Sequence, residues 1–332
     1  MPDAVVMRGI RKAFGRKVAV DDVDLVVPEG GMVGLIGPNG AGKTTGIRMI
    51  MSIIFPDRGE LEVLGRRSAS ESKDRIGYLP EERGVYKKMK VRKFLRHMAA
   101  LKGLRGPDVD ERITAWLERV ELPGVAGKKC EELSKGMQQK VQFIASVIHD
   151  PDLLILDEPF SGLDPVNMRL LRELIREQHH KGVTVLFSTH VMVHAEQVCG
   201  HIVMIHDGRK VLDGSMQEIR ARHDTRRLIF EPADPAADPS RDGDIEGVAN
   251  IRRSDNGWEA DVEPDADPTR AIAALASTLP VSRVEVHRPT LEDIFIEIVG
   301  GGSAAEGQTE AELRAAVRAG GLASAQTEEV PA

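Results

Sequence analysis

Short apolar runs dominate the first residues of the chain and predict strands. They have the length and β-branched character of strands, and Pro28–Gly31 supplies turn residues before the last of them. The runs occupy residues 5–7, 18–20, 24–27 and 33–36. A helix is then predicted from Lys43 to about Ile53, because Pro56 stops the pattern.

The apolar pattern changes to a helical period in the middle of the chain. Apolar side chains recur three or four positions apart over residues 91–101 and 113–120, which predicts helices there. Residues 153–156 and 183–187 are continuous apolar runs of the buried parallel-strand type, separated by a helical stretch at about 167–181. Strands that alternate with helices predict an α/β domain with right-handed crossovers.

A change of composition after about Arg222 predicts a second, small α+β domain. Residues 232–243 are rich in Pro, Ala and Asp, which predicts a loop. The predicted elements are a hairpin over 251–262 turned at Asp255–Asn256–Gly257, a helix over about 269–279, a strand over 281–286 and a final helix. Thr290 and Asp293 have the spacing of a capping box at the start of that helix. No sizeable apolar face recurs over residues 301–332, which predicts a disordered tail.

Charge and cysteine usage narrow the functional classes. A net charge of -7 over 332 residues argues against a general nucleic-acid binder, which needs clustered Lys and Arg. The apolar segment Met49–Phe55 is far too short to span a membrane, and the first residues lack the pattern of a signal peptide. Cys130 and Cys199 stand far apart and fit small core residues in a reducing cytosol. Work at a membrane would therefore need a partner.

A glycine-rich segment carries the strongest chemical signal. It matches G-x-x-x-x-G-K-[ST] between a predicted strand and a predicted helix, the context that a phosphate-binding loop requires. The residues are Gly37, Pro38, Asn39, Gly40, Ala41, Gly42, Lys43 and Thr44, and we include the adjacent Thr45 in the predicted nucleotide site. Inward N–H groups and the helix N-terminus would bind phosphate, while Lys43 would reach the β- and γ-phosphates and Thr44 would bind Mg²⁺. The alternative, a chance glycine-rich turn, is disfavoured by this placement.

Two adjacent carboxylates, Asp157 and Glu158, follow the apolar run 153–156. Neighbouring side chains on a strand point to opposite faces, so the two can have different roles. Asp157 would hold the Mg²⁺ shell, and Glu158 would act as general base toward the attacking water. An ordinary acidic exit from a strand is the alternative, and it is weakened by the phosphate-binding loop upstream.

Three further motifs make the chain resemble the ATP-binding cassette (ABC) ATPases. Residues 133–140, with Ser134 and Gly136, resemble the signature motif of that family. Ser161–Asp164 resembles the D-loop, and Ser188–Thr189–His190 resembles the segment of the switch histidine. Phe14 lies where the family places an aromatic that stacks on adenine. The order of the motifs is that of the family, and the resemblance covers about residues 4–214.

The resemblance implies a mechanism. Two ATP-binding subunits, expected to be copies of one chain, would sandwich two ATP molecules. Ser134 and Gly136 of one subunit would contact the γ-phosphate held by the other, at the N-terminus of a helix. His190 would sense the γ-phosphate and hold the attacking water, which gives Lys43, Glu158 and His190 as the expected catalytic residues; in isolation, His190 would be a structural histidine. ATP and Mg²⁺ are the expected cofactors.

Two segments depart from the family pattern. The signature segment has Lys135 where the family has Gly and Met137 where it has Gln, while Ser134 and Gly136 match. The segment Ile76–Pro80 resembles the family's lid segment, which usually ends in Gln, whereas Glu81 stands here. Its carboxylate could still reach Mg²⁺ or the attacking water, so Glu81 joins Thr44 and Asp157 as an expected metal ligand. The alternative is a solvated acid within the charged cluster Glu81–Arg83.

The stretch 78–86 and the ending 289–295 resemble a branch of sodium-efflux and drug-efflux ATPases with a C-terminal accessory domain. The resemblance implies an α/β P-loop ATPase of ABC type with a parallel-sheet core, an N-terminal antiparallel β portion and an inserted helical subdomain. The expected divisions are an ATP-binding domain at 1–221, with its helical subdomain at about 83–150, an α+β accessory domain at 222–300 and a tail at 301–332.

The expected function is to couple ATP hydrolysis to export through a separate transmembrane permease, with the chain peripheral on the cytoplasmic face of the cell membrane. The alternatives are a soluble ABC ATPase of translation or DNA repair and a regulator that binds nucleotide without turnover. The first is disfavoured because such proteins generally have two ATP-binding cassettes in one chain or a long coiled-coil insertion, and this sequence shows neither. The second is disfavoured because Lys43, Asp157, Glu158 and His190 are intact.

Overall fold

The computed structural model describes residues 2–82, 84–223, 226–241, 245–254 and 257–303. The chain divides into two compact units. The large unit comprises the residues up to Met216 together with those from Ile298 on, and the small unit comprises Gln217–Glu297.

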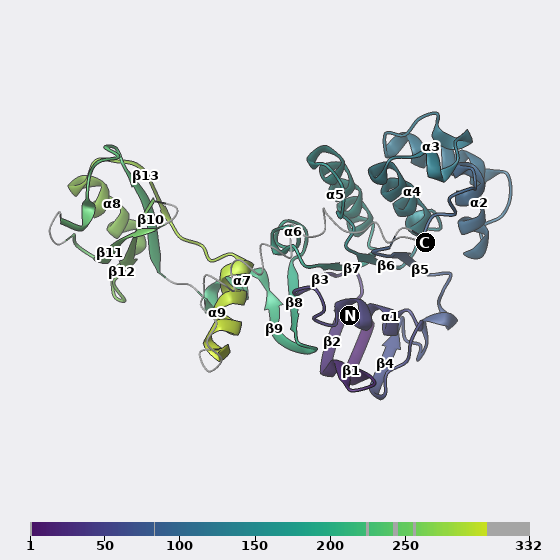
Figure 1. Ribbon diagram of the computed structural model, residues 1–332, viewed down its shortest axis with the longest axis horizontal. Helices are drawn as coiled ribbons and strands as arrows, with labels where there is room; N and C mark the ends of the chain where they lie inside the picture. The colour runs from purple at the N-terminus through teal and green to yellow at the C-terminus, as the bar shows by residue number, and fades with distance from the viewer. Residues whose placement is uncertain (1, 83, 224–225, 242–244, 255–256, 304–332) are drawn as a thin grey trace. The chain divides into compact units, whose positions relative to one another are not determined.

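The core of the large unit is a six-stranded sheet of order β5-β6-β7-β3-β8-β9 (Figure 1). Only β9 runs antiparallel to its neighbour. The strands are β3 (Met32–Ile36), β5 (Ile76–Leu79), β6 (Leu153–Asp157), β7 (Thr184–Thr189), β8 (His201–His206) and β9 (Arg209–Ser215). Every residue of β3, β6 and β7 is buried, as expected for parallel strands that are covered on both faces. The predicted α/β class with a parallel-sheet core is therefore confirmed.

An antiparallel sheet of order β2-β1-β4 forms the N-terminal part of the large unit. Its strands are β1 (Asp3–Phe14), β2 (Lys17–Pro28) and β4 (Arg58–Val63). The apolar runs 18–20 and 24–27, predicted as separate strands, belong to the single strand β2. The reason is an extra residue in β2 between Val20 and Val23, where the pairing with β1 shifts and Asp22 takes a φ of +55°.

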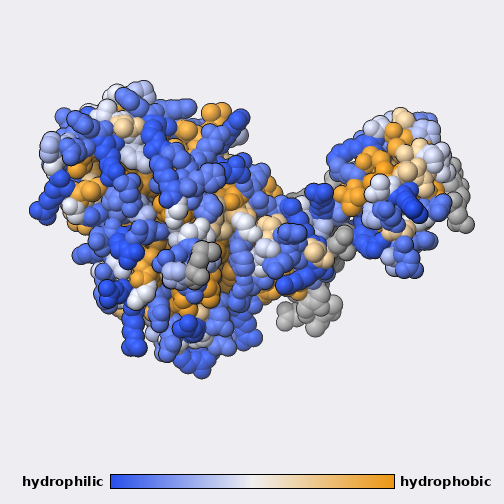
Figure 2. Space-filling model, turned by 180° about the vertical axis from the view of Figure 1, so that it is seen from behind, coloured by the Kyte–Doolittle hydropathy of each residue, from blue (hydrophilic) through white to orange (hydrophobic). Residues whose placement is uncertain are grey.

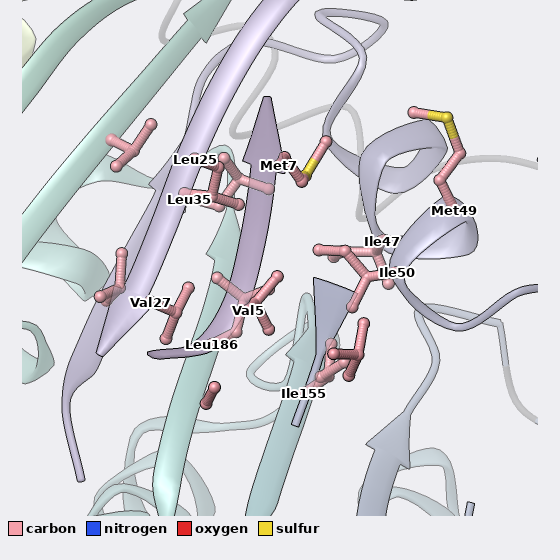
Figure 3. Close-up of a cluster of buried hydrophobic side chains, with 14 of the residues drawn as sticks. Val5, Met7, Leu25, Val27, Leu35, Ile47, Met49, Ile50, Ile155 and Leu186 are labelled. Atoms are coloured by element: carbon pink, nitrogen blue, oxygen red, sulfur yellow. The ribbon is translucent and has the colours of Figure 1, made fainter. Parts of the chain in front are cut away.

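Helix α1 (Lys43–Ile50) contributes to an apolar cluster shared with both sheets (Figure 3). Val5 and Leu25 enter the cluster from the antiparallel sheet, and Ile155 and Leu186 enter it from the six-stranded sheet. The helix ends at Ile50 rather than at about Ile53, because Ser52 adopts a left-handed φ of +55° that a helix does not allow.

Helices cover the remaining surface of the sheet. Figure 1 shows α5 (Pro165–His180) and α6 (Met192–Val198) on the face of the six-stranded sheet opposite α1. The inserted helices α2 (Val91–Leu101), α3 (Asp108–Arg119) and α4 (Lys135–Val147) pack on one another, with Trp116 against Phe143. Short 3-10 turns occupy Ala69–Glu71, Val125–Gly127, Cys130–Glu132 and Pro239–Arg241. The helical periods at 91–101 and 113–120 are confirmed by α2 and α3.

The small unit is an antiparallel sheet of order β11-β12-β10-β13 with a helix packed on it. Its elements are α7 (Met216–Arg222), β10 (Arg227–Pro232), β11 (Val248–Ser254), β12 (Gly257–Val262), α8 (Pro268–Thr278) and β13 (Val281–Val286). Helix α9 (Leu291–Ser303) follows, and its residues from Ile298 on belong to the large unit. Phe230 and Leu275 are fully buried in its core. Strand β10 was not predicted, since it lies just before the Pro-rich loop.

Two predictions for the end of the chain meet the structure directly. The capping box is confirmed, because the backbone N–H of Thr290 donates to Asp293 (3.0 Å) and that of Asp293 donates to Thr290 Oγ1 (3.2 Å). Residues 301–303, predicted as part of a disordered tail, are helical in α9. The rest of that predicted tail, 304–332, and the predicted turn residues 255–256 lie outside the described residues.

The surface carries no sign of a membrane span within the part of the chain that the structure describes. The face of the protein seen in Figure 2 is largely hydrophilic, with hydrophobic side chains gathered in separate patches. No described helix has both the length and the apolar character needed to cross a bilayer.

Candidate nucleotide-binding site

The candidate residues lie at one edge of the six-stranded sheet. Parallel strands deliver their carboxyl ends to the same edge, where ligands bind in open α/β sheets. At this edge Glu81 follows β5, and the glycine-rich loop follows β3. Asp157 is the last residue of β6 and Glu158 follows it, while His190 follows β7. The fold therefore brings together four segments that are far apart in the sequence.

The glycine-rich loop has a conformation that only glycine tolerates at key positions. Gly37 has a φ of +149°, and a Cβ there would lie 2.0 Å from the carbonyl oxygen of Ile205. Gly42 is the N-cap residue of α1, with a φ of +109°, and a Cβ there would lie 2.4 Å from the carbonyl oxygen of Ala19. No side chain caps α1, so its first N–H groups are left for a ligand. Such an uncapped helix start after a glycine loop is suited to binding phosphate.

Lys43 is held inside this loop. Its Nζ donates to the carbonyl oxygens of Gly37 (2.7 Å) and Pro38 (3.0 Å), and the residue is 6% exposed. Burial lowers the pKa of Lys43, whereas the charges of Glu158, Asp157 and Glu81 act to raise it. The ammonium group of Lys43 is therefore held by two backbone carbonyl oxygens and lies in the field of three carboxylates. A bound phosphate group would take over part of these interactions with the ammonium group.

Asp157 has the character of a metal ligand. It is 1% exposed, and neither of its carboxylate oxygens makes a hydrogen bond of normal geometry among the described residues, although the hydroxyls of Ser188 and Thr44 are near enough to affect its pKa. Burial, together with the charges of Glu81 and Glu158, raises the pKa of Asp157 to about 6, against the lowering effect of the Ser188 and Thr44 hydroxyls. A buried carboxylate without partners is costly, and a bound divalent cation would compensate it. The residues present therefore fit Mg²⁺.

Glu158, in contrast, has hydrogen-bond partners on both carboxylate oxygens. Its Oε1 accepts the backbone N–H of His190 (2.8 Å) and lies 2.6 Å from Nδ1 of the same residue. Its Oε2 accepts the hydroxyl of Thr189 (3.0 Å). Glu158 has a left-handed φ of +48°, uncommon for a non-glycine residue, and its backbone N–H donates to Ser188 O (3.0 Å). These contacts fix the orientation of the carboxylate, and His190 Nε2 remains without a partner among the described residues.

A pocket of about 360 Å³ joins several of the predicted residues. Its lining includes Phe14, Asn39, Gly40, Gly42, Lys43, Thr44, Thr45, Glu81 and Glu158. Phe14 is 51% exposed, so its ring is accessible for stacking on a planar ligand. Two lining residues, Lys17 and Ala19, were not predicted, and the signal that could have found them is their position beside Phe14 across the β1–β2 turn.

Ser134 and Gly136 lie outside the pocket lining. Ser134 is the N-cap of α4, and its hydroxyl accepts the N–H of Met137 at 3.3 Å. A Cβ at Gly136 would lie 3.4 Å from a side-chain atom of Leu163, so the signature segment adjoins the D-loop segment. The structure thus places Gly136 beside Leu163, and neither Ser134 nor Gly136 lines the pocket of its own chain.

A phosphate-binding loop on β3, an acidic pair after β6 and a histidine after β7 define a P-loop ATPase of the ABC class. Two family descriptions match the chain: "ABC transporter" over residues 20–161, and "ATP-binding protein DrrA1-3-like, C-terminal domain" over residues 214–299. The second covers the whole of the small unit.

Individual relatives extend this similarity over nearly the whole chain. The chain is 40% identical to an uncharacterized ABC transporter ATP-binding protein, YhaQ, of Bacillus subtilis, over 88% of this chain and 97% of that protein. It is 34% identical to Nod factor export ATP-binding protein I of Cupriavidus metallidurans, over 89% of this chain and 96% of that one. The chain therefore belongs to the ATP-binding proteins of ABC transporters, a family of ATPases whose members bind ATP and work with a transmembrane component.

Solved structures agree with this assignment. A structure described as the ATP binding subunit of an ABC transporter is 32% identical and has a TM-score of 0.62, covering 66% of this chain and 92% of that chain. The structure of cbiO1 from Clostridium perfringens, at 21% identity and a TM-score of 0.59, shares the fold.

Proposed function

We propose that this chain is the ATP-hydrolysing subunit of an exporter and that it acts on a permease in a separate polypeptide at the cytoplasmic face of the membrane. The observation that carries the proposal is that similarity to a Nod factor export protein extends over 89% of the chain. That span is too long for the ATP-binding portion alone, and the small unit resembles the C-terminal domain of DrrA1-3-like proteins.

The pocket supports a division of labour among its residues. The exposed ring of Phe14 stacks on the adenine, and residues 37–45 hold the phosphates through backbone N–H groups and the ammonium of Lys43. Bound Mg²⁺ would neutralise charge on the β- and γ-phosphates, held by the Thr44 hydroxyl and the carboxylate of Asp157, with Glu81 near enough to contribute. Asp157 suits this role because its buried oxygens have no other partner among the described residues.

Glu158 acts as the general base. Its carboxylate lines the pocket and is oriented by Thr189 and His190, so it can accept a proton from a water molecule placed near the γ-phosphate. His190 presents its unpartnered Nε2 for a contact with the γ-phosphate or with the water.

Hydrolysis requires a second copy of the chain. Ser134 and the N–H of Gly136 lie outside their own pocket, at the start of α4. In a dimer of two such subunits they would contact the γ-phosphate bound by the other copy. ATP then holds the pair together, and its hydrolysis lets the pair separate, which moves the attached permease.

The test is an affinity purification of tagged Glu158→Gln protein from detergent-solubilised membranes of its native host, followed by mass spectrometry. A stoichiometric polytopic membrane protein, recovered in the presence of ATP, is the expected result. Recovery only of ribosomes, of DNA-repair proteins or of the chain itself from the soluble fraction would overturn the exporter proposal and leave the ATPase assignment standing.

A further inference from the structure

Two adjacent glutamines of helix α4 make hydrogen bonds to different parts of the chain. The side chain of Gln138 donates to the carbonyl oxygens of residues 130 and 133 (3.1 and 3.0 Å), just before the signature pair. The side chain of Gln139 donates instead to the carbonyl oxygen of Pro159 (3.0 Å), the residue that directly follows Glu158. Gln139 therefore connects the helix that begins at the signature segment with the segment that holds the expected general base.

The hydrogen bond between Gln139 and Pro159 is buried. Gln139 is 2% exposed, and Pro159 is buried as well. Proline has no backbone N–H, so its carbonyl oxygen is the backbone polar group that this residue offers to a neighbour. A buried carbonyl that loses its donor is left without water to replace it. The contact thus holds the backbone after Glu158 at a fixed place against α4.

The backbone of Glu158 depends on contacts on both of its sides. Its left-handed φ of +48° is strained for a non-glycine residue, and such strain persists only where the surroundings determine it. Before the side chain, the N–H of Glu158 donates to Ser188 O in β7 (3.0 Å). After it, Pro159 O accepts from Gln139. Because the direction of a side chain follows its backbone, both contacts influence where the carboxylate points.

Helix α4 contacts the segment after Glu158 a second time. A Cβ at Gly136 would lie 3.4 Å from a side-chain atom of Leu163, so the first turn of α4 packs on the far end of residues 159–163. Between the two contacts Phe160 is 4% exposed, with its ring centroid 5.4 Å from that of Phe187. The segment is therefore set against α4 at both ends and packed on the sheet in its middle.

A purely structural role for Gln139, as a buried polar side chain that happens to find an acceptor, is the alternative. Gln178 in α5 is a useful comparison, because it is also 2% exposed. Its Nε2 has no hydrogen-bond partner among the described residues. Burial of a glutamine amide in this protein thus does not by itself impose a contact with a backbone carbonyl.

We propose that Gln139 is a positioning residue for ATP hydrolysis. Through the carbonyl of Pro159 it holds Glu158 in the orientation in which the carboxylate can accept a proton from the attacking water. Gln139 does not line the nucleotide pocket, so it acts through Glu158 rather than on the nucleotide. This inference rests on the proposed role of Glu158 as general base and adds a residue on which that role depends.

The test begins with substitutions that remove the donor in the full-length chain. Gln139→Met keeps the length of the side chain, and Gln139→Glu keeps its shape but cannot donate when it is ionised. We expect kcat to fall about tenfold in both variants while KM for ATP stays the same. Gln178→Met, at the same 2% exposure, is the matched control and should keep the wild-type kcat. Each variant is checked for ATP binding, and phosphate release is then measured over a range of ATP concentrations.

A double-mutant cycle with Glu158→Gln distinguishes positioning from a general effect on the fold. If Gln139 acts through Glu158, Gln139→Met should not lower the residual single-turnover rate of Glu158→Gln any further. A structural role would lower the rate by the same factor whether or not Glu158 is present.

The outcomes separate this inference from the function beneath it. If Glu158→Gln loses activity while Gln139→Met keeps the wild-type kcat, the inference is wrong and the proposed function stands. The same conclusion follows if the two losses multiply, if only KM changes, or if neither Gln139 variant binds ATP. If Glu158→Gln itself turns over ATP normally, the proposed role of the base fails, and the inference fails with it.

Discussion

Lysine is used in opposite ways at two pockets of the large unit, the nucleotide pocket and a pocket that we call the basic pocket. The basic pocket is lined by Tyr86, Lys87, Lys88, Met89, Lys90 and Lys93. Lys43 is 6% exposed, donates to two backbone carbonyls and faces the charges of Glu158, Asp157 and Glu81. The lysines of the basic pocket are exposed, and no ion pair holds them within the described part of the chain. The nucleotide site holds one lysine charge beside opposite charges. The basic pocket holds several lysine charges that no ion pair among the described residues compensates.

The two pockets differ in how large an effect the loss of a single contact is expected to have. Fixed groups in a dry site act through preorganised geometry, so the loss of one contact carries a large cost. Flexible surface charges each contribute little, because water and salt screen them, and they act as a group. Large effects are therefore expected from single changes at the nucleotide site, and small ones from single changes at the basic pocket.

The largest expected effect follows Glu158→Gln. Removal of the general base should lower the rate of ATP hydrolysis by about 10² to 10⁴-fold, while ATP still binds and a dimer accumulates. Phosphate release and size-exclusion chromatography with ATP measure the two effects. Glu173→Gln, an exposed residue of α5 paired with Arg169, is the matched control and should turn over ATP normally. Undiminished turnover in Glu158→Gln would remove Glu158 from the role of base.

The next effect tests the backbone of the phosphate-binding loop. Gly37→Ala places a methyl group 2.0 Å from Ile205 O and should cost about 2–4 kcal/mol of stability together with most of the ATP affinity. Gly40→Ala is the control, since Gly40 has a φ of +80° but no atom within 4 Å of the added Cβ. It should cost only about 1 kcal/mol. If Gly37→Ala and Gly40→Ala lose equal stability in chemical denaturation, the close approach of the added Cβ to Ile205 O has no effect on stability.

A smaller effect is expected at Thr189, which orients the base without lining the pocket. Thr189→Val removes a hydrogen bond to the Glu158 carboxylate, and we expect kcat to fall about tenfold while KM stays the same. Thr189→Ser keeps the hydroxyl and should restore kcat. A purely structural role would instead give equal losses in both variants or a change in thermal stability that accounts for the loss of activity.

The sequence predicts contiguous features of the site better than those made by strand pairing. Gly37–Thr44 and Asp157–Glu158 are local motifs beside apolar strands, so their placement at one sheet edge could be predicted. Lys17 enters the pocket because it pairs with Phe14 across the β1–β2 turn, and that pairing is evident only once the two strands are known to form a hairpin. The hydrogen bond from Thr189 to Glu158 likewise depends on the pairing of β6 with β7.

The same reasoning applies to the basic pocket and to the fold around it. The backbone there is held by hydrogen bonds in which Lys87 O and Met89 O accept from residues 131 and 130, contacts between distant segments that no local pattern encodes. The division of residues 17–28 into two predicted strands failed for a related reason. A bulge near Asp22 interrupts the apolar alternation without ending the strand.

The smallest expected effect is a change in stability on substitution of Lys90, the N-cap residue of α2 in the basic pocket. Lys90 has the extended backbone of an N-cap residue, with φ -67° and ψ 142°, but no side-chain acceptor. Lys90→Ser supplies one and removes a charge from the positive end of α2, so the isolated chain should gain about 1 kcal/mol. Lys87→Ser removes the same charge from the same pocket without reaching the cap and should leave stability unchanged. A gain from Lys90→Ser alone in urea denaturation would show that the native lysine is kept at a cost to the stability of the isolated chain. Equal stability of both variants would show that helix capping at Lys90 has no effect on stability.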